Sequence, residues 1–579
     1  MTVGGELAPR VNRARRVMLT ATSSIKPPPS ALAVLAAVPA WWARRVAAHG
    51  IDPEAAPVWD SVDAAPPFDL SALADVGARE DLWEASPEAL GDAYVCALDA
   101  KARAETGRHY TPAVLAAAMW QQTLETLGGD AGGLVLDLAC GTGALLVPPL
   151  RTWVAERGGM QAELALSAVT SVVAGCDLDE TAVWLGNVLL AAELLPLWAR
   201  VPPERRRALP AVLTTGDGLQ RAVKARVVIM NPPYGRVRLA PDERARWSHA
   251  VYGHANRYGL FMAGAVDQVE EGGVVTALVP AGWLGGSYFQ RLRSFLAERA
   301  PLTRVGFVGD RSGVFATGVL QETLVASFTS GAPADRPVSC ERIVVGDDRA
   351  HRQPMGLGRI PDRPDLPWLL PRDPTDTPLV DAAAAMPARL SDYGWVASTG
   401  PLVWNRHRPQ LSRYPGEGLV RVVWAADLDG GRLHQDPARD DLRYCLIRNE
   451  KDERFLVLGS PAVLVPRTTA PEQPRRLLGT ELDRSALERW GGRVVVENHV
   501  NVLTCTRPDS PLTPGLLVAL LGSEALDRLY RCLTGSVAVS AYELAALPMP
   551  DADTLRRWQR HDAGQLGGEI EAHYAGAPR

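Results

Sequence analysis

Four apolar runs between residues 134 and 230 each carry a polar side chain at or just after their end, and this succession limits the possible fold more than any other feature. The runs cover residues 134–138, 171–176, 212–215 and 226–230, and helical stretches separate them. Strand-like runs that alternate with helical segments are typical of a parallel sheet wrapped by helices. Open sheets of this kind bind ligands outside the carboxyl ends of their strands. The sequence therefore predicts an α/β fold with a site at that edge.

The chain divides by pattern into four parts, since 579 residues are too many for one ordinary domain. The alternating pattern covers residues 105–330 and continues with strands at 273–279, 304–308 and 323–328 and a helix at 289–298. The other parts that we expect are a helical N-terminal extension at 1–104, a Pro/Asp-rich linker or irregular segment at 331–390, and a separate α+β module at 391–579.

Charge, cysteine and lysine content exclude several classes of protein. With 61 basic and 66 acidic side chains the net charge is −5, so the chain cannot coat nucleic acid by charge alone. The seven cysteines include no C-x-x-C pair, which disfavours a disulfide framework and a zinc site, so we expect no metal and a reducing cytoplasm. The apolar run 31–42 is too short to span a bilayer, so we expect no membrane contact. No lysine lies in a Walker A pattern, which excludes an ATP-driven motor.

The run 226–230 leads into Asn231-Pro232-Pro233-Tyr234, the most informative stretch of the chain. Two prolines stiffen the turn, and an amide and an aromatic ring flank them. An amine conjugated to a purine ring is a poor nucleophile and reacts only when it is held correctly. The Asn231 side-chain oxygen and the Pro232 carbonyl can each accept a hydrogen bond from such an amine, and Tyr234 can stack on the base. This pattern indicates a methyl-acceptor site, against the alternative of an ordinary proline-rich turn.

The earlier strand ends carry carboxylates and glycines that suit a nucleotide-like cofactor. Asp137 ends the first strand and is followed by the turn Cys140-Gly141-Thr142-Gly143, where backbone amides are open to close approach. Asp177, at the second strand, can take both ribose hydroxyls, and Asp217, after the third, can accept from an adenine amino group. A dinucleotide is disfavoured because the third glycine of G-x-G-x-x-G is missing.

With these elements in this order, residues 105–330 resemble the gamma-class adenine-specific DNA methyltransferases, such as the TaqI-like type II restriction-modification methylases. The segment 107–112 is similar to the element that precedes the cofactor turn in that class. The stretches 256–261, 272–275 and 279–284 look like its later elements. The resemblance implies a Rossmann-like S-adenosyl-L-methionine-dependent methyltransferase domain, followed by a C-terminal target-recognition domain.

The resemblance also assigns roles to individual residues. It implies that the cofactor is lined by Tyr110, Thr111, Asp137, Ala139, Gly141, Gly143, Asp177, Leu178, Asp217 and Gly218. It implies that the target adenine is held by Asn231, Pro232, Pro233, Tyr234 and Phe315. An adenine inside a duplex cannot reach the methyl donor, so the nucleotide must flip out, and Tyr234 and Phe315 are the expected pair of stacking rings. No Pro-Cys pair is present, which disfavours a cytosine-ring methylase with a cysteine nucleophile.

The implied activity is site-specific methylation of the 6-amino group of adenine in double-stranded DNA. Such an enzyme is the modification partner of a restriction-modification or related phage-defence system, with any restriction endonuclease on a separate chain. Stretches of 391–579 are similar to recognition regions of type II adenine methylases, among them 467–469, 475–477, 497–502 and 533–536. Our candidates for DNA contacts there are Arg406, Arg408, Arg467, Arg475 and Arg476.

Three other interpretations stay open on the sequence. The same motif could serve a methyltransferase for RNA or for a protein glutamine. The reason is that a glutamine amide also fits the turn Asn231–Tyr234, which we call the acceptor turn. A non-catalytic DNA-binding subunit on a methylase scaffold is the second. A fused nuclease is the third, since Glu88 with Asp99-Ala100-Lys101 loosely imitates a metal-nuclease pattern.

Overall fold

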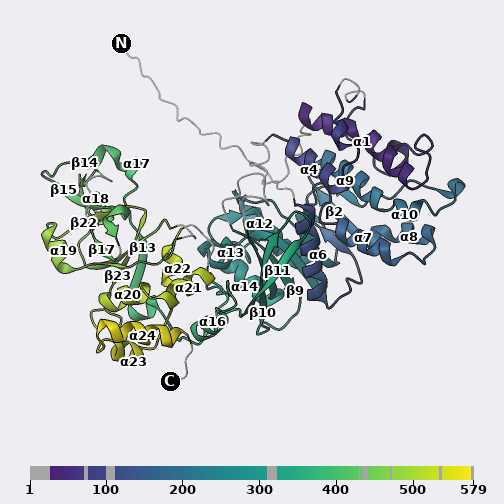
Figure 1. Cartoon of the computed structure of the whole chain (residues 1–579). Coiled ribbons are helices and arrows are strands. Elements are labelled where there is room, and N and C mark those ends of the chain that lie inside the picture. The colour runs from purple at the N-terminus through teal and green to yellow at the C-terminus, as the bar shows by residue number, and fades with distance from the viewer. Residues whose placement is uncertain are drawn as a thin grey trace, which may run out of the picture. The chain divides into compact units, whose positions relative to one another are not determined.

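The computed structural model groups the chain into two compact units. Unit 1 comprises Met1–Ala100, Asp137–Ala222 and Arg236–Ala240, and unit 2 comprises Lys101–Leu136, Val223–Gly235 and Pro241–Arg579. The residues that the structure describes are 27–70, 73, 76–99, 111–309, 322–429, 431–434, 441–469, 473–533 and 538–575. Figure 1 shows the helices and strands along the chain.

The centre of unit 1 is a pair of parallel strands, β2 (Val173–Asp177) and β3 (Leu213–Thr215), in which Asp177 pairs with Thr215. The helices α7 (Val147–Glu156), α8 (Ala162–Ala168) and α9 (Glu180–Glu193) belong to the same unit. The α9 helix begins at Asp179, whose carboxylate accepts from the N–H groups of Thr181 and Ala182. Asn187 of α9 donates its side-chain N–H to the Leu213 carbonyl at 3.1 Å, which fixes the helix to β3.

Two N-terminal helices of unit 1 pack on α9, namely α1 (Pro29–Ala48) and α4 (Pro87–Ala97), and the short helix η1 (Glu80–Leu82) packs on α1. The α1 helix has 20 residues, longer than its apolar run suggested, and by length and composition alone it could cross a membrane. However, Trp41 and Trp42 are 0% and 1% exposed, and their indole N–H groups donate to the carbonyls of Ala85 and Ala56. The apolar side of α1 is therefore covered by the protein itself.

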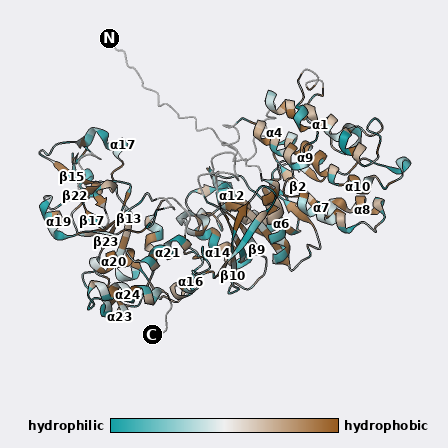
Figure 2. Cartoon of the chain, in the orientation of Figure 1, coloured by the Kyte–Doolittle hydropathy of each residue, from teal (hydrophilic) through white to brown (hydrophobic). Residues whose placement is uncertain are grey.

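Unit 2 contains a mixed sheet whose parallel part holds the acceptor turn. The strand β4 (Ala225–Met230) pairs in parallel with β1 (Val135–Asp137), through Val135 and Leu136, and with β7 (Val269–Pro280). The next strands are β9 (Thr323–Thr329) and β8 (Leu302–Gly309), which add an antiparallel part. The helices α6 (Ala113–Leu127), α12 (Arg257–Gln268) and α14 (Gln290–Arg299) belong to this unit. Apolar residues, brown in Figure 2, are concentrated in the sheet beside α12.

The segment 331–390, which we expected to be a linker or irregular, is largely folded. It contains β10 (Val338–Val345), β11 (Ala350–Gly358) and α16 (Thr377–Ala384). The strand β10 pairs in parallel with β8, with Ser339 opposite Arg304, and β11 pairs with β10 in antiparallel register. These strands extend the sheet of unit 2, so the prediction was wrong here: the Pro/Asp-rich composition hid two strands whose hydrogen-bond partners lie elsewhere in the chain.

The described residues in the C-terminal part of unit 2 form a four-stranded sheet, a five-stranded sheet, short two-stranded pairs and helices. One sheet has the strand order β13 (Trp395–Thr399), β23 (Val500–Cys505), β20 (Ala462–Pro466), β21 (Thr480–Leu482). The second contains β14 (Leu411–Ser412), β18 (Tyr444–Leu446), β15 (Leu419–Val423), β22 (Val494–Val496) and β19 (Val457–Leu458). The helices α20 (Pro514–Leu521), α21 (Glu524–Leu533), α22 (Ala541–Ala545), α23 (Ala552–Trp558) and α24 (Ala563–Tyr574) complete this part. They share an apolar core with β13, β20 and β23.

A buried arginine ties this C-terminal part to the sheet that carries the acceptor turn. Arg293 of α14 is 0% exposed, and it donates to the carbonyls of Trp283 at 2.8 Å and Gly286 at 2.9 Å. Its other terminal nitrogen donates to the Asp365 carbonyl at 2.5 Å and to the Tyr542 hydroxyl at 3.1 Å. One guanidinium thus joins the turn after β7, the 365 segment and α22.

Candidate functional site

The glycine turn of unit 1 has the open backbone that the sequence predicted. Gly141 and Gly143 have φ angles of +50° and +82°, a region that disfavours any side chain. The Cys140 N–H donates to the Cys176 carbonyl at 3.0 Å, which anchors the turn beside β2. A Cβ atom built on Gly141 meets no atom within 4 Å. The turn therefore has free space in front of its backbone at Gly141.

Asp177 connects this turn to the loop after β2. Its Oδ2 accepts the Gly141 N–H and its Oδ1 accepts the Asp179 N–H, both at 2.9 Å. Two backbone donors thus hold the carboxylate at the carboxyl end of β2. The next residue, Leu178, is 46% exposed. An apolar side chain thus lies open beside a fixed carboxylate, a combination suited to a nucleoside.

Asp137 is a buried carboxyl group in the same cluster. It is 1% exposed, and its Oδ1 accepts the Ala139 N–H at 3.0 Å. The pKa of Asp137 is raised to about 8, mainly by burial and also by the negative charge of Asp177, although the Ala139 N–H lowers it. The group is thus poised to lose its proton when a positive charge comes near.

Asp217 and Gly218 follow β3 in unit 1. The Asp217 carboxylate accepts the Leu219 N–H and the Gln220 side-chain N–H, each at 3.0 Å, and so begins the short helix η4 (Gly218–Gln220). A Cβ atom on Gly218 would lie 2.1 Å from the Leu138 carbonyl oxygen. Only glycine fits there, because two backbone segments of the cluster are in direct contact.

The acceptor turn in unit 2 is held by hydrogen bonds from distant parts of the chain. The Asn231 side-chain N–H donates to the Thr111 hydroxyl at 3.0 Å. The Tyr234 hydroxyl lies 3.1 Å from Asn231 Oδ1 and 3.2 Å from the Leu278 carbonyl, to either of which it can donate. Thr111, which the resemblance assigned to the cofactor, is placed here beside Asn231. The amide of Asn231 therefore has a fixed orientation.

An aromatic row continues from this turn. The Tyr234 ring meets Tyr258 edge-on, with centroids 6.2 Å apart, and Tyr258 stacks on Phe289 at 5.3 Å. Burial raises the pKa of both tyrosine hydroxyls, so Tyr234 keeps its proton and stays a donor. Pro232 is buried, and Pro233 is half-buried. The expected ring partner Phe315 and the expected cofactor residue Tyr110 lie outside the described residues.

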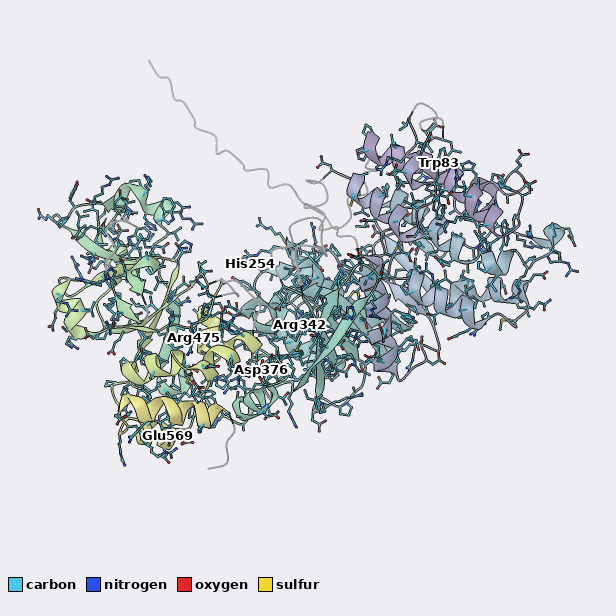
Figure 3. The ribbon with its side chains drawn as sticks, viewed as in Figure 1. Trp83, His254, Arg342, Asp376, Arg475 and Glu569 are labelled. Carbon is cyan, nitrogen blue, oxygen red and sulfur yellow. The ribbon has the colours of Figure 1, made fainter. Side chains whose placement is uncertain are left out.

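Several exposed side chains of unit 2 were missed in the sequence. Tyr252 and Tyr288 are 47% and 42% exposed, Arg291 lies over the Tyr252 ring, and His254, labelled in Figure 3, meets the Tyr288 ring at 5.0 Å. Tyr252 and His254 follow the acceptor turn, and Tyr288 and Arg291 follow the carboxyl end of β7. Isolated aromatic and basic residues give no periodic signal, so only their gathering in space distinguishes them.

The five arginines predicted to contact DNA differ in exposure. Arg406 and Arg408 are exposed, and Arg467 is partly buried. Arg475, labelled in Figure 3, donates to the Gly522 carbonyl at 3.0 Å. The expectation that Arg476 contacts DNA is not supported, because Arg476 is only 2% exposed. Its guanidinium donates to the Thr469 hydroxyl and lies over the Tyr530 ring. It belongs to the core of the C-terminal part and has no free surface for DNA.

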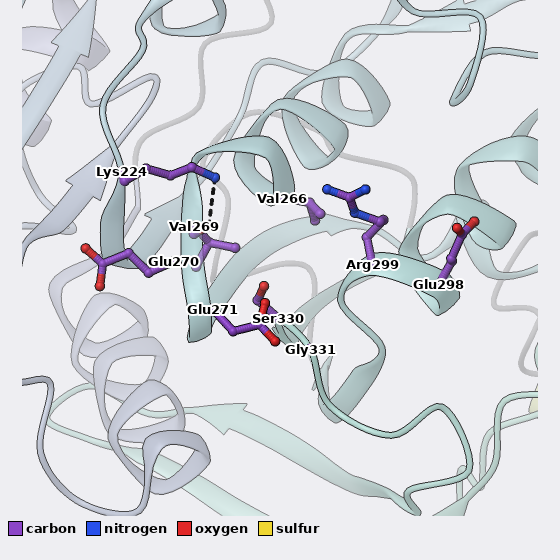
Figure 4. Close-up of a pocket in the computed structure, with 9 residues that line it drawn as sticks. All are labelled: Lys224, Val266, Val269, Glu270, Glu271, Glu298, Arg299, Ser330 and Gly331. Atoms are coloured by element: carbon purple, nitrogen blue, oxygen red, sulfur yellow. Dashed lines mark hydrogen bonds between the residues drawn. The ribbon is translucent and has the colours of Figure 1, made fainter.

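Three other polar features of the described residues do not form a second reactive site. The pocket in Figure 4 is lined by Lys224, Val266, Val269, Glu270, Glu271, Glu298, Arg299, Ser330 and Gly331. It lies at the first residues of β7, the opposite strand end from Asn231, and the Lys224 ammonium is engaged by the Asp267 carbonyl at 2.8 Å. No cluster of three His, Cys, Asp or Glu side chains that could hold a metal occurs in the described part of the chain. Glu88 of the nuclease-like pattern pairs with Arg151 at 3.0 Å, and Lys101 lies outside the described residues.

Comparison with known proteins places a family match over the acceptor turn. Residues 210–315 match the family model of the Eco57I restriction-modification methylase. The chain is 27% identical over 335 residues to the Type II methyltransferase M.PstI of Providencia stuartii, covering 56% of this chain and 65% of that relative. It is 25% identical over 468 residues to the Type II methyltransferase M.BsuBI of Bacillus subtilis, covering 79% of this chain and 89% of that relative.

Solved structures also resemble the chain. The type IIG restriction endonuclease BpuSI aligns over 94% of this chain and 72% of its own, with 13% identity and a TM-score of 0.42. The type IIL restriction-modification enzyme MmeI, solved in complex with DNA, aligns over 89% of this chain and 83% of its own, with 12% identity and a TM-score of 0.48.

Proposed function

We propose, from the Eco57I-type restriction-modification methylase domain that this chain carries, that the protein is a site-specific DNA methyltransferase that acts on the 6-amino group of adenine. The observation that carries the proposal is the fixed amide of Asn231, held between the Thr111 and Tyr234 hydroxyls. An immobile hydrogen-bond acceptor beside an aromatic ring suits a planar base that carries an exocyclic amine. The gamma-class assignment belongs to the same proposal.

The cluster in unit 1 fits S-adenosyl-L-methionine. The free space at Gly141 admits a ligand against the backbone, the Asp177 carboxylate at the end of β2 is a hydrogen-bond acceptor suited to ribose hydroxyls, and the exposed Leu178 offers an apolar surface to the adenine. A positively charged ligand near Asp137 would stabilise its carboxylate and lower its raised pKa, so binding of such a ligand would release the proton. When bound, this cofactor supplies an electrophilic methyl group.

The residues of unit 2 act on the acceptor. Asn231 Oδ1 and the Pro232 carbonyl accept the two N–H groups of the amine and so orient its lone pair. The Thr111 hydroxyl keeps the Asn231 amide from turning. The Tyr234 ring stacks on the base, and its hydroxyl lies beside the same Asn231 oxygen that the amine needs. Binding of the base therefore requires the Tyr234 hydroxyl to share this oxygen or to donate to the Leu278 carbonyl instead.

The substrate is double-stranded DNA in this proposal, and its recognition falls to residues 391–579. An adenine within a duplex must leave the helix to reach a fixed acceptor turn, so we include base flipping. Exposed Arg406 and Arg408, with Arg467 and Arg475, are the proposed phosphate and base contacts. A cytoplasmic restriction-modification or phage-defence role, with a nuclease on a separate chain, is part of the same proposal.

Transfer of labelled methyl groups to DNA tests the proposal directly. The full chain is incubated with methyl-labelled S-adenosyl-L-methionine and unmethylated duplex DNA, and the DNA is then digested to nucleosides. We expect the label in 6-methyladenine. Label in cytosine, in added RNA or in protein glutamine would reject the adenine assignment, and DNA binding without any transfer would favour a non-catalytic subunit.

A further inference from the structure

The turn between β22 and β23 places a carboxylate inside the protein and an imidazole at its surface. The side chain of Glu497 is 1% exposed and that of His499 is 50% exposed. Glu497 Oε1 accepts from His499 Nδ1 at 2.7 Å, and Oε2 accepts the His499 backbone N–H at 2.8 Å. A buried carboxylate loses its hydration unless it is paired, and both oxygens of this one are paired with a single residue. The carboxylate thus orients the imidazole.

The orientation determines which ring nitrogen is available. A carboxylate can only accept, so Nδ1 of His499 carries the proton that it donates to Glu497. Nε2 lies on the opposite side of the ring, where it can accept a hydrogen bond from another molecule. An exposed histidine without such a partner samples several rotamers, whereas this ring is held in one.

The backbone that carries the pair is itself held in place. The Arg467 N–H donates to the His499 carbonyl at 2.7 Å, and the Asn498 N–H donates to the Leu402 carbonyl at 3.0 Å. A Cβ atom on Gly400 would lie 2.2 Å from the Glu497 carbonyl oxygen, so the 400 segment runs directly against the turn. Three segments that are distant in the sequence therefore meet at His499.

These neighbouring segments bring positive charge and an aromatic ring. The Arg467 guanidinium donates to the Asn498 carbonyl at 3.3 Å. Two residues after Leu402 the short helix α17 (Trp404–His407) begins, in which Trp404 is 40% exposed and Arg406 is exposed. Arginines with an exposed indole suit a nucleic-acid backbone.

Other uses of an oriented histidine find no support nearby. The only side-chain hydrogen bond of His499 within the described ranges is to Glu497, so it activates no hydroxyl or thiol nucleophile there. Glu497 and His499 also belong to no three-residue cluster that could hold a metal, again among the residues that are described. A hydrogen bond that Nε2 accepts from a bound molecule remains the chemistry that the geometry offers.

We infer that His499, positioned by Glu497, contacts a base edge of the target duplex and determines specificity at one base pair, with Arg467 beside it on a phosphate. The inference rests on the proposed function and deepens it. Base edges in the major groove present acceptors and donors that one fixed nitrogen can distinguish, whereas phosphates are the same at every position.

A panel of duplexes tests this inference on the full chain. Each duplex carries one base substitution in the methylated site, and kcat/KM is measured for the natural protein, His499→Ala and His499→Gln. For His499→Ala we expect the preference for the natural base to fall about tenfold at one position, with unchanged cofactor affinity. Glu497→Gln should also lower the preference for the natural base, and at the same position of the site. His351→Ala, at an exposed histidine of β11, is the matched control and should change nothing.

The outcomes separate the inference from the proposed function. Unchanged preferences and DNA affinity in both His499 variants would overturn the inference while methyl transfer continues. An equal loss for every duplex, with a smaller salt dependence, would overturn it too, because that indicates a phosphate contact. If the natural protein transfers no methyl group, the proposed function fails, and binding of the same fluorescent duplexes decides the inference. His499→Gln keeps a polar group at this position, and its base preference tests the inference if the alanine variant does not fold.

Discussion

The Tyr234 hydroxyl lies 3.1 Å from Asn231 Oδ1, the atom that we propose as the acceptor for the exocyclic amine. The same hydroxyl is 3.2 Å from the Leu278 carbonyl, so a second acceptor is within reach. Tyr234 therefore orients the Asn231 amide before a base arrives and can release its oxygen without losing its own hydrogen bond.

Replacement of Asn231 by alanine should abolish methyl transfer. The variant lacks the fixed acceptor, so the amine is no longer held, and a loss of about a hundredfold or more in kcat is expected. Cofactor affinity, measured by calorimetry, should stay close to that of the natural protein, because Asn231 does not belong to the cluster around Asp177. Loss of both methyl transfer and cofactor binding would show that the role of Asn231 is misassigned.

Tyr234→Phe separates the hydroxyl from the ring. It keeps the stacking surface but removes the donor beside Asn231, so we expect kcat to fall by about tenfold with little change in KM. Tyr234→Ala removes both and should also weaken binding of a duplex that contains the target adenine. An unchanged kcat in Tyr234→Phe would contradict a role for the hydroxyl, and equal losses in the two variants would contradict a separate role for the ring.

The pKa of Asp137, raised to about 8 by burial, predicts a pH dependence of cofactor binding. Below that pH the carboxyl is protonated, and a cationic ligand must displace this proton when it binds. Affinity for the ligand should therefore rise as the pH approaches and passes 8. Asp137→Asn should bind more weakly and without this dependence. Calorimetry with S-adenosyl-L-methionine across this range checks it, and a flat profile for the natural protein would refute it.

The same group affects stability. Its folded pKa lies above its ordinary value of 3.8, so between these values the native state holds a proton that the unfolded chain does not. Stability therefore falls as the pH rises through this window, by at most about 1.4 kcal/mol per pH unit. Denaturant unfolding without ligand should show a smaller decline in Asp137→Asn than in the natural protein.

Gly218→Ala should destabilise unit 1. The new methyl group would lie 2.1 Å from the Leu138 carbonyl oxygen, and since this is a backbone atom the two segments must separate, at a cost of about 1–3 kcal/mol. Gly159→Ala is the control, because nothing lies within 4 Å of its Cβ position. Thermal unfolding should show a lower midpoint for the first variant only.

Arg293→Met should loosen the connection between the sheet of unit 2 and its C-terminal part. The substitution leaves the carbonyls of Trp283 and Gly286 without their donor, and buried acceptors without donors cost about 1–3 kcal/mol each. Arg299→Met, at an exposed position of the same helix, should have little effect. Equal unfolding midpoints for both variants would contradict the structural role of Arg293.

The sequence pattern was sufficient to predict a strand where the strand is marked by its own run of apolar residues. The strands β1, β2, β3 and β4 coincide with the predicted runs to within two residues at each end. For β1, β2 and β4 the reason is that a buried parallel strand appears in the sequence as a continuous apolar run. The strands β10 and β11 were missed because their exposed, Pro- and Asp-rich surroundings hide a pairing that depends on β8. Arg476 appeared as a surface arginine because nothing in its neighbourhood of the sequence reveals the Tyr530 ring.

By itself, the sequence determined the succession of these strands along the chain and the polar residue at the end of each. It could do so because apolar runs and turn residues are properties of short segments. Only the tertiary structure decided which of these groups satisfy one another. Thr111 fixes an amide 120 positions away, and Asp177 takes the Gly141 N–H across 36 positions. Hydrogen bonds and pKa shifts depend on distances in space and on exclusion of water, and neither can be read from positions along a chain.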